Sequence, residues 1–340
     1  MKKVKYLFHR ILEMDYKSFF DTIKRIAKKE HKLRIYVFFD AVRCGLLHQA
    51  GYVDYEFYNM INLNHSDRTK IMTRGRNNHY VATLNPKEYY HFFDNKNEFN
   101  EKFSKYLNRD WMYINGSNFD EFKKFTAKHN IIIVKPNNLS CGKGVRKIDT
   151  KKEDIKKLYD ELYNTETYLI EEVAKQNKIM NKLHAESVNT VRLVTIVSDY
   201  GVVSVVAGVV RMGTNHNVVD NFNGGGIAAM IDLETGKINS AAINTEGKIY
   251  EKHPTTKVKL VGFQIPLYDE IIKMVKEAAL VVPEERLIGW DVCVGETKPC
   301  LIEANQFPAH DLYQPIFDVN NVKGVIPIFE KAIKKRNEDE

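Results

Sequence analysis

The sequence predicts an α+β protein whose strands form largely antiparallel sheets behind a helical N-terminal region. Three observations support this prediction. Short β-branched runs recur between residues 131 and 305, two pairs of them are joined by short turns as hairpins, and helical patterns stand between others. A chain of 340 residues, of which 44% are hydrophobic, can also bury a sizeable core and build two or three lobes.

The N-terminal region is basic and helical in pattern. Residues 1–34 are rich in Lys and Arg, with aromatic residues between them, and residues 35–115 are polar with many Tyr, Phe and Asn. Apolar residues recur at helical spacing in the first segment, namely Ile11, Phe19, Phe20, Ile23 and Ile26. Such amphipathic helices either pack on the body of the protein or lie on an anionic membrane surface. We expect residues 1–115 to form a helical region that helps to shape an acceptor pocket.

The first group of strands lies between residues 116 and 175, where we expect a small lobe. The run IIIVKP (131–136) predicts a short buried strand, and the glycine-bearing segment 137–148 predicts a turn that leads into a second strand. A helix is expected over 151–164 and a strand over 167–173.

The second group of strands is expected to form a larger lobe over residues 176–330. Two β-branched runs, 190–199 and 201–213, predict a hairpin around the Tyr200–Gly201 turn. A glycine cluster and another strand follow in NFNGGGIAAMID. The remaining expected segments are a helix over 266–282, a last hairpin from 287–294 and 298–305, and a charged tail over 331–340.

Net charge, the length of apolar runs and the spacing of cysteines indicate which partners and which cellular compartment suit this chain. The net charge of +7 suits an anionic partner, and nucleotide, nucleic acid, acidic sugar and membrane surface remain open on charge alone. No stretch approaches the ~18 consecutive apolar residues of a membrane span, and we expect no secretory signal. The four cysteines form no CxxC pair, which favours a reducing cytoplasm, and we expect Cys293 and Cys300 in the core.

Three oxygen-bearing side chains lie on the last predicted hairpin. Glu303 and Asn305 stand two apart in an extended run, so their side chains point to the same face, and Asp291 lies on the preceding strand. Carboxylate and amide oxygens suit Mg²⁺ rather than zinc. The sequence therefore predicts a magnesium site that would bridge these residues to nucleotide phosphates.

A lysine and a glycine-bearing loop follow the first buried strand. Lys135 ends this strand, where a charge is costly unless it meets an anion. The next loop contains Ser140, Gly142, Lys143 and Gly144, and glycines let backbone N–H groups approach phosphate oxygens closely. The loop is not a Walker A motif, and an ordinary Gly-Lys-Gly hairpin turn remains the alternative.

Other strand ends carry further polar groups. Arg192 and Arg211 lie at strand ends of one hairpin, which suits a triphosphate or, alternatively, a pair of surface salt bridges. Asp220 and Asn221 precede three glycines, which either allow close approach to a ligand or form a flexible hairpin tip. The strand end Glu171–Val173 suits an adenine edge, and an exposed edge strand is the alternative.

These segments, in this order, resemble the ATP-grasp superfamily. The Asp291…Glu303-x-Asn305 arrangement is similar to the magnesium-binding strand pair of D-alanine–D-alanine ligases, and VKP, a glycine loop and YLIEEV are similar to the nucleotide-clamping half. The segments SVNTVRLVT, DNFNGGGIAAMID, IGWDVCV and LIEANQFP resemble the sugar-transfer-associated ATP-grasp group, which includes teichuronic-acid biosynthesis proteins and occurs with capsule genes. The resemblance covers about 80–320 and implies two α+β lobes that clamp ATP between antiparallel sheets.

The resemblance also implies roles for individual residues. Nucleotide contacts would come from Lys135, Ser140, Gly142, Lys143, Gly144, Glu171, Glu172 and Val173. Arg192 and Arg211 would act in catalysis, and Asp291, Glu303 and Asn305 would ligate magnesium. Substrate contacts would come from Asn189, Asp220, Asn221, Gly225 and His310. The loop is poorer in glycine than many ATP-grasp loops, and no ribose-binding acid follows Glu172 at a clear spacing.

The implied activity is ligation driven by ATP with Mg²⁺. A carboxylate attacks the γ-phosphate to give an acylphosphate, and an amine then displaces phosphate. The alternative is a phosphotransferase that uses the same site on a small amino acid or sugar. We expect a small-molecule or sugar-linked acceptor in cell-surface polysaccharide synthesis. We also expect a cytoplasmic protein, with peripheral association at the inner face of the membrane as an option, and no nucleic-acid partner, because no RNA-binding motif is recognisable.

Overall fold

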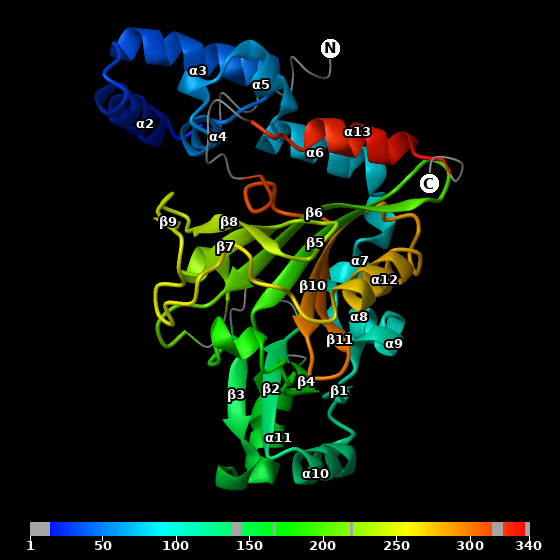
Figure 1. Ribbon diagram of the computed structural model, residues 1–340. Coiled ribbons are helices and arrows are strands. Elements are labelled where there is room, and N and C mark those ends of the chain that lie inside the picture. Colours follow the sequence, from blue (N-terminus) through cyan, green and yellow to red (C-terminus); the bar gives the residue numbers. More distant parts are fainter. Residues whose placement is uncertain (1–13, 138–143, 166–167, 218–219, 315–321, 337–340) are drawn as a thin grey trace. The chain divides into compact units, whose positions relative to one another are not determined.

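The computed structural model describes residues 14–137, 144–165, 168–217, 220–314 and 322–336. The chain divides into two compact units (Figure 1). The first unit comprises Met1–Thr83 and His310–Lys331, and the second comprises Leu84–Ala309 and Ala332–Glu340. The boundaries expected at residues 115, 175 and 330 concern lobes rather than these units, and they stay a prediction.

The first unit is helical, as the sequence predicts for this region. The Asp15 carboxylate caps the first described helix by accepting a hydrogen bond from the Ser18 N–H at 3.0 Å. That helix buries Phe19, Ile23 and Ile26 against its neighbours. The elements of this unit are α2 (Tyr16–Lys29), α3 (Arg34–His48), α4 (Tyr52–Phe57), η1 (Met60–Asn62), α5 (His65–Lys70) and α6 (Arg74–Leu84), and α13 (Ile326–Lys334) begins in it.

The second unit contains a four-stranded antiparallel sheet in the order β1-β4-β2-β3. Ile132 and Val134 alternate with more exposed residues along β2 and pack with Phe122 and Leu162 of two helices on one face of this sheet. The strand predicted over 131–136 is confirmed. The elements are β1 (Trp111–Tyr113), β2 (Ile131–Pro136), β3 (Arg146–Asp149), β4 (Tyr168–Glu172), α10 (Phe119–Lys128), η3 (Thr150–Lys152) and α11 (Ile155–Thr165).

A seven-stranded antiparallel sheet forms the larger part of the second unit, in the order β11-β10-β5-β6-β7-β8-β9. Both hairpins predicted from the sequence are present, as β5–β6 and β10–β11. The strands are β5 (Thr190–Val197), β6 (Val203–Met212), β7 (Ile227–Ile231), β8 (Ile238–Ile243), β9 (Ile249–Tyr250), β10 (Leu287–Val294) and β11 (Pro299–Asn305). The helices are η2 (Lys87–Tyr89), α7 (His91–Asp94), α8 (Lys96–Lys102), α9 (Ser104–Leu107), η4 (Met180–Lys182), η5 (Phe222–Gly224) and α12 (Tyr268–Ala278).

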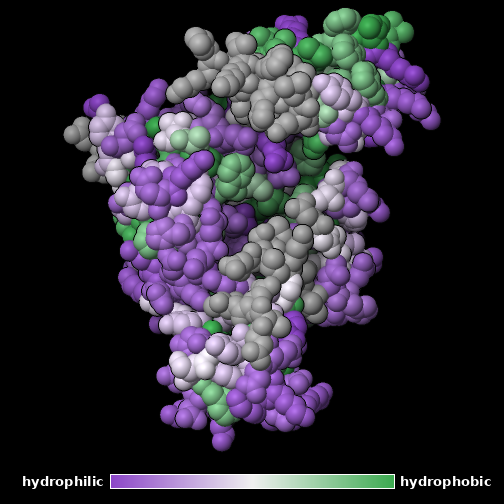
Figure 2. Space-filling view, turned by 180° about the vertical axis from the view of Figure 1, so that it is seen from behind, coloured by the Kyte–Doolittle hydropathy of each residue, from purple (hydrophilic) through white to green (hydrophobic). Residues whose placement is uncertain are grey.

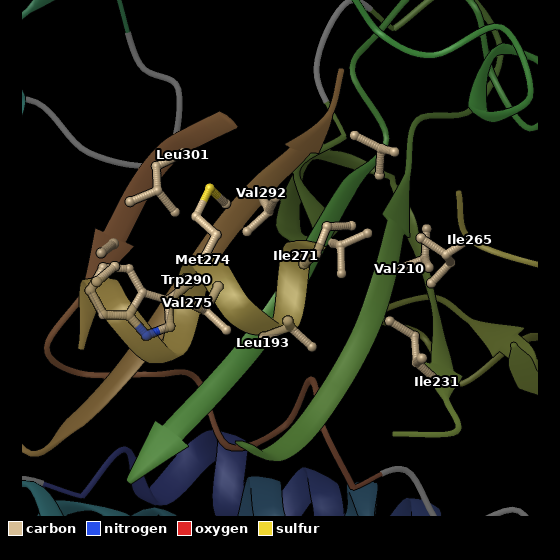
Figure 3. Packing of buried hydrophobic residues seen from close by; sticks show 14 of the residues in the cluster. Leu193, Val210, Ile231, Ile265, Ile271, Met274, Val275, Trp290, Val292 and Leu301 are labelled. Carbon is tan, nitrogen blue, oxygen red and sulfur yellow. The ribbon is translucent and has the colours of Figure 1, made fainter. Parts of the chain in front are cut away.

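The core of this sheet lies on the face that α12 covers (Figure 3). Ile271, Met274 and Val275 of α12 pack among strand residues that include Leu193 and Trp290. Cys293 and Cys300 are buried opposite each other on β10 and β11, which confirms them as core residues. Leu193 and Trp290 are adjacent in sequence to Arg192 and Asp291. Because side chains alternate along a strand, Arg192 and Asp291 project from the face opposite α12. Within the described ranges, each helix is too short or too polar to cross a bilayer.

Candidate active site

A row of charged residues crosses three neighbouring strands of the larger sheet. Arg192 on β5 is paired in register with Asp291 on β10, and Asp291 is paired with Glu303 on β11. Arg211 projects from β6 toward the same carboxylate, at 3.1 Å from Nη1 to Asp291 Oδ2. Sequence-distant residues therefore meet on the face opposite α12.

Asp291 is fully buried between the two arginines. Its Oδ1 accepts a hydrogen bond from Arg192 Nε, and its Oδ2 accepts one from Arg192 Nη2 at 2.7 Å. Burial opposes ionisation, but the Arg192 and Arg211 guanidinium groups outweigh it and hold the pKa of Asp291 well below its ordinary value. The same pairing, together with Asp220, raises the pKa of Arg211 against its burial. Asp291 and Arg211 are therefore both charged at neutral pH.

Glu303 differs from Asp291 although the two face each other. The residue is exposed on the edge strand, but neighbouring protein atoms surround its carboxyl group and partly desolvate it. This desolvation, followed by repulsion from Asp291, raises the pKa of Glu303. Two residues on, the Asn305 Nδ2 atom is buried without a hydrogen-bond partner among the residues that the structure describes.

These three residues fit a magnesium ion. Two facing carboxyl groups repel each other unless a cation or a proton lies between them. Asn305, two residues after Glu303 on the same strand, can add its amide oxygen as a further ligand. Carboxylate and amide oxygens are the donors that Mg²⁺ prefers. Because Asp291 is already engaged by two arginines, Glu303 and Asn305 are the more available ligands.

The smaller sheet presents a second charged group, centred on Glu171 of β4. Lys135 Nζ lies 2.5 Å from Glu171 Oε2, and Arg109 Nη2 lies 2.6 Å from Glu171 Oε1. The Asn100 amide donates a further hydrogen bond at 3.1 Å. Burial opposes the charge of Glu171, but Arg109 and Lys135 lower its pKa to about 2. The Glu171 side chain is therefore a buried anchor for Lys135.

Lys96 lies near both charged groups and was missed in the sequence. Its Nζ donates a hydrogen bond to the Asn137 carbonyl at 3.1 Å, and burial lowers its pKa, with smaller influences from Glu303, Lys135 and Glu171. It therefore lies near residues of both sheets. The polar segment around it carries no motif, so only tertiary structure distinguishes it from a surface lysine. Arg109, just before β1, was missed for the same reason.

Part of the predicted nucleotide-binding loop lies outside the described residues, namely Ser140, Gly142 and Lys143. Gly144 is exposed with a left-handed φ of +71°, a conformation that favours glycine. Glu172 ends β4, and its carboxylate accepts a hydrogen bond from the Asp110 N–H at 3.3 Å. Val173 follows, half-buried. Their nucleotide contacts stay a prediction.

The predicted substrate-binding residues lie in different environments. Asn189 is fully buried, and its amide donates hydrogen bonds to the His184 and Met180 carbonyls, while its Oδ1 has no partner in the described parts of the chain. Asp220 is buried against Arg211 at 3.2 Å and also accepts hydrogen bonds from Thr190. Both residues are buried and bonded to other protein groups, and their substrate contacts stay a prediction.

The glycine cluster and His310 complete the set. Asn221 is half-buried, and its carbonyl accepts hydrogen bonds from the Gly224 and Gly226 N–H groups. Gly225 is exposed with a φ of +91°. His310 belongs to the first unit, where its Nε2 lies 2.8 Å from Asp54 Oδ1. Acceptor contacts by these residues stay a prediction.

Comparison with known families identifies the chain. The sequence model of the family described as sugar-transfer associated ATP-grasp matches residues 75–333. The chain belongs to this family. The two antiparallel sheets with their helices are accordingly an ATP-grasp fold, as the sequence predicts, and the chain is a member of a superfamily of ATP-grasp ligases.

Solved ATP-grasp structures are similar to this chain at low identity. The ligase PsnB complexed with minimal precursor is 15% identical, with a TM-score of 0.42, over 74% of this chain and 63% of PsnB. D-alanyl-alanine synthetase A from Vibrio cholerae is 12% identical, with a TM-score of 0.40, over 73% of this chain and 62% of that one. D-alanine–D-alanine ligase from Bacillus anthracis complexed with ATP is 14% identical, with a TM-score of 0.37, over 64% and 56%.

This ATP-grasp chain thus spans less than two thirds of the length of each of these structures. Among curated protein sequences, none matches it.

Proposed function

We propose that this ATP-grasp protein joins a carboxylate to an amine, with ATP and Mg²⁺, through an acylphosphate. The observation that supports this proposal most is the row Arg192–Asp291–Glu303, with Arg211 beside it and Lys96 and Lys135 nearby. It combines cations for a triphosphate with oxygen ligands for a metal. Membership of the family supports the ATP-dependent ligase class.

The charged residues have separate tasks in this proposal. Lys96 and Lys135 bind phosphate oxygens of ATP, and Glu171 holds Lys135 in place. Arg192 and Arg211, oriented by Asp291, stabilise negative charge on the γ-phosphoryl group as it is transferred. Glu303 and Asn305, with Asp291, would hold magnesium, which would neutralise charge on the phosphates.

The proposed reaction has two balanced steps. An oxygen of the acceptor carboxylate attacks the γ-phosphorus, the bond to the β–γ bridging oxygen breaks, and ADP leaves. The nitrogen of an amine then attacks the acyl carbon, inorganic phosphate leaves, and the nitrogen loses a proton to give an amide. Positioning and electrostatics suffice for both steps, so no nucleophilic side chain of the protein is needed.

The acceptor is proposed to belong to cell-surface polysaccharide synthesis, such as a capsule or a teichuronic-type polymer. The description of the family as sugar-transfer associated supports this assignment. The acceptor is then a small molecule or a sugar-linked acid or amine, and the reaction takes place in the cytoplasm. Asn221 and Gly225, in the glycine cluster, are the residues proposed to contact such acceptors, and the buried Asp220 holds Arg211 beside them.

The experiment that tests this proposal measures products rather than ATP consumption alone. Purified protein with Mg²⁺ and ATP is screened against uronic acids, amino acids and sugar nucleotides, with hydroxylamine present to trap an acylphosphate. Free phosphate that depends on both an acid and an amine supports the ligase. A stable phosphorylated acceptor means a phosphotransferase instead, and failure of Mg²⁺–ATP to raise the melting temperature contradicts both.

A further inference from the structure

The helix α3 is apolar on two opposite faces. Val37, Ala41 and Cys44 are buried against the other helices of the first unit. On the opposite side, Ile35 and Phe39 are 60% and 62% exposed, and Leu46 is 57% exposed. Their spacing of four and seven residues places them in one line along the helix. A surface helix needs only one apolar face to pack, so the second face is available for a partner.

Aromatic stacking extends this face onto the neighbouring helix. Phe20 of α2 is 56% exposed, and its ring stacks on Phe38 with centroids 6.2 Å apart and an interplanar angle of 5°. Phe38 in turn contacts Phe39 edge to face. We name Phe20, Ile35, Tyr36, Phe39, Leu46 and Leu47, all more than half exposed, the apolar stripe. Figure 2 shows hydrophobic surface over these helices at the upper right of the view.

The excess positive charge of the chain is concentrated in the same part of the sequence. Residues 1–34 contain 11 Lys and Arg and 4 Asp and Glu, out of 51 and 44 in the whole chain. The other 306 residues therefore carry 40 charges of each sign, and the first 34 residues hold the entire net charge of +7. Among the described residues, Lys17, Lys24 and Lys28 lie on the helix face of Phe20 and are exposed.

We propose that the apolar stripe and these lysines dock the protein on an anionic lipid bilayer. A helix with exposed Phe and Leu beside Lys and Arg inserts its apolar side chains among the acyl chains while its cations meet the headgroups. Lysine stems reach the headgroups from positions beside the stripe. A second copy of the chain fits less well, because it would bring two surfaces of like charge together. Docking of this kind does not depend on the proposed ligase activity.

Vesicle binding by the full-length protein tests this proposal. Partition is measured by flotation on vesicles of phosphatidylcholine alone and on vesicles that contain about one third phosphatidylglycerol. We expect at least about tenfold stronger binding to the anionic vesicles, because each lysine near the surface adds to the attraction. Raising NaCl from about 0.05 M to about 0.5 M is expected to weaken binding, since salt screens surface charges.

Two variants separate the apolar and electrostatic contributions. Phe39→Ser with Leu46→Ser shortens the stripe, and Lys24→Glu with Lys28→Glu reverses two charges, and each is expected to lower anionic-vesicle partition about tenfold or more. Matched controls in the second unit are Leu280→Ser, at 50% exposure, and Lys123→Glu with Lys124→Glu on α10, and both should bind as the unaltered protein does. All seven substitutions in these four variants lie on exposed side chains, so thermal unfolding should change little.

Several results would overturn the proposal. Equal binding to neutral and anionic vesicles would mean that the lysines do not contribute to docking. Absence of binding to both kinds of vesicle would mean that the stripe does not dock on a membrane. If light scattering shows a dimer that Phe39→Ser with Leu46→Ser dissociates, and vesicles are not bound, the stripe is an interface between copies. Salt-sensitive binding to single-stranded RNA in place of vesicles would assign the charges to nucleic acid.

Discussion

At the scale of single residues, the pKa values of two facing carboxyl groups, those of Asp291 and Glu303, are shifted in opposite directions. The pKa of Asp291 is lowered by two guanidinium groups that enclose it, whereas the pKa of Glu303 is raised by desolvation and by Asp291 itself. Asp291 therefore orients the two arginines, and Glu303 is the more available of the two carboxyl groups for a cation. The two residues look equivalent in the sequence, because the pattern does not indicate which of the two acids forms ion pairs with the arginines.

Glu303→Ala separates function from folding. We expect ATP turnover to fall at least about 100-fold, because a group that helps to stabilise charge at the phosphates is lost. The melting temperature should stay close to that of the unaltered protein, since the side chain is exposed on an edge strand. Phosphate release and calorimetry measure the two effects. Glu296→Ala, in the exposed turn of the same hairpin, is the control, and unchanged turnover in Glu303→Ala would refute the metal assignment.

The burial of Glu285 leads us to predict that the stability of the protein depends on pH. Both of its carboxylate oxygens are buried without a hydrogen-bond partner in the described part of the chain, and burial, with Asp94 and Glu88 nearby, raises its pKa from 4.5 to about 8. Between these two values the folded protein keeps a proton that the unfolded chain releases, so the stability contribution falls as pH rises and levels off above about pH 8. Glu285→Gln stays neutral and should remove this slope.

The measurement is urea unfolding of Glu285→Gln and the unaltered protein across pH. Near pH 8.5 we expect Glu285→Gln to be more stable by about 2 kcal/mol, and near pH 4.5 the two should converge. Glu284→Gln, at the adjacent exposed position, is the control and should follow the unaltered protein. A constant difference at every pH would mean that Glu285 is not protonated in the folded state.

At the scale of elements, strand register brings the site together. The sequence predicts the hairpins β5–β6 and β10–β11 and places Arg192, Asp291 and Glu303 on them, because alternation and turn residues are local signals. It does not predict that β10 pairs with β5, which makes Asp291 the direct neighbour of Arg192. Pairing between strands about 90 residues apart is decided by packing of the whole sheet, so the ion pair could not be foreseen.

Asp291→Asn tests the structural role that this register gives the residue. The substitution keeps the volume of the side chain but leaves Arg192 and Arg211 without their shared carboxylate in a buried position. We expect the free energy of unfolding to fall by about 3 kcal/mol, as for other broken buried pairs. Urea unfolding measures this loss, with Glu303→Ala as the comparison that should change little. Equal stability of the two variants would mean that the arginines do not need Asp291.

At the scale of the whole molecule, Arg109 links the two sheets of the second unit. Arg109 precedes β1, yet its guanidinium group donates to the Leu301 carbonyl of β11 and to Glu171 of β4. It thereby ties the strand that carries Glu303 to the strand that anchors Lys135. The order of motifs along the chain predicts two lobes, but residues between lobes, such as Arg109 and Lys96, follow no periodicity and have no local signal.

Arg109→Leu should weaken this link and the binding of ATP together. Its side chain is almost fully buried, so the substitution leaves the Glu171 carboxylate short of a partner and should cost about 3 kcal/mol of unfolding free energy. Because Lys135 and Glu303 would then be held less firmly relative to each other, KM for ATP should rise more than kcat falls. Arg146→Leu is the control, since its ion pair with Glu161 is exposed and contributes less than about 1 kcal/mol. If Arg109→Leu lowers stability but leaves KM for ATP unchanged, Arg109 supports the fold without positioning Lys135 and Glu303.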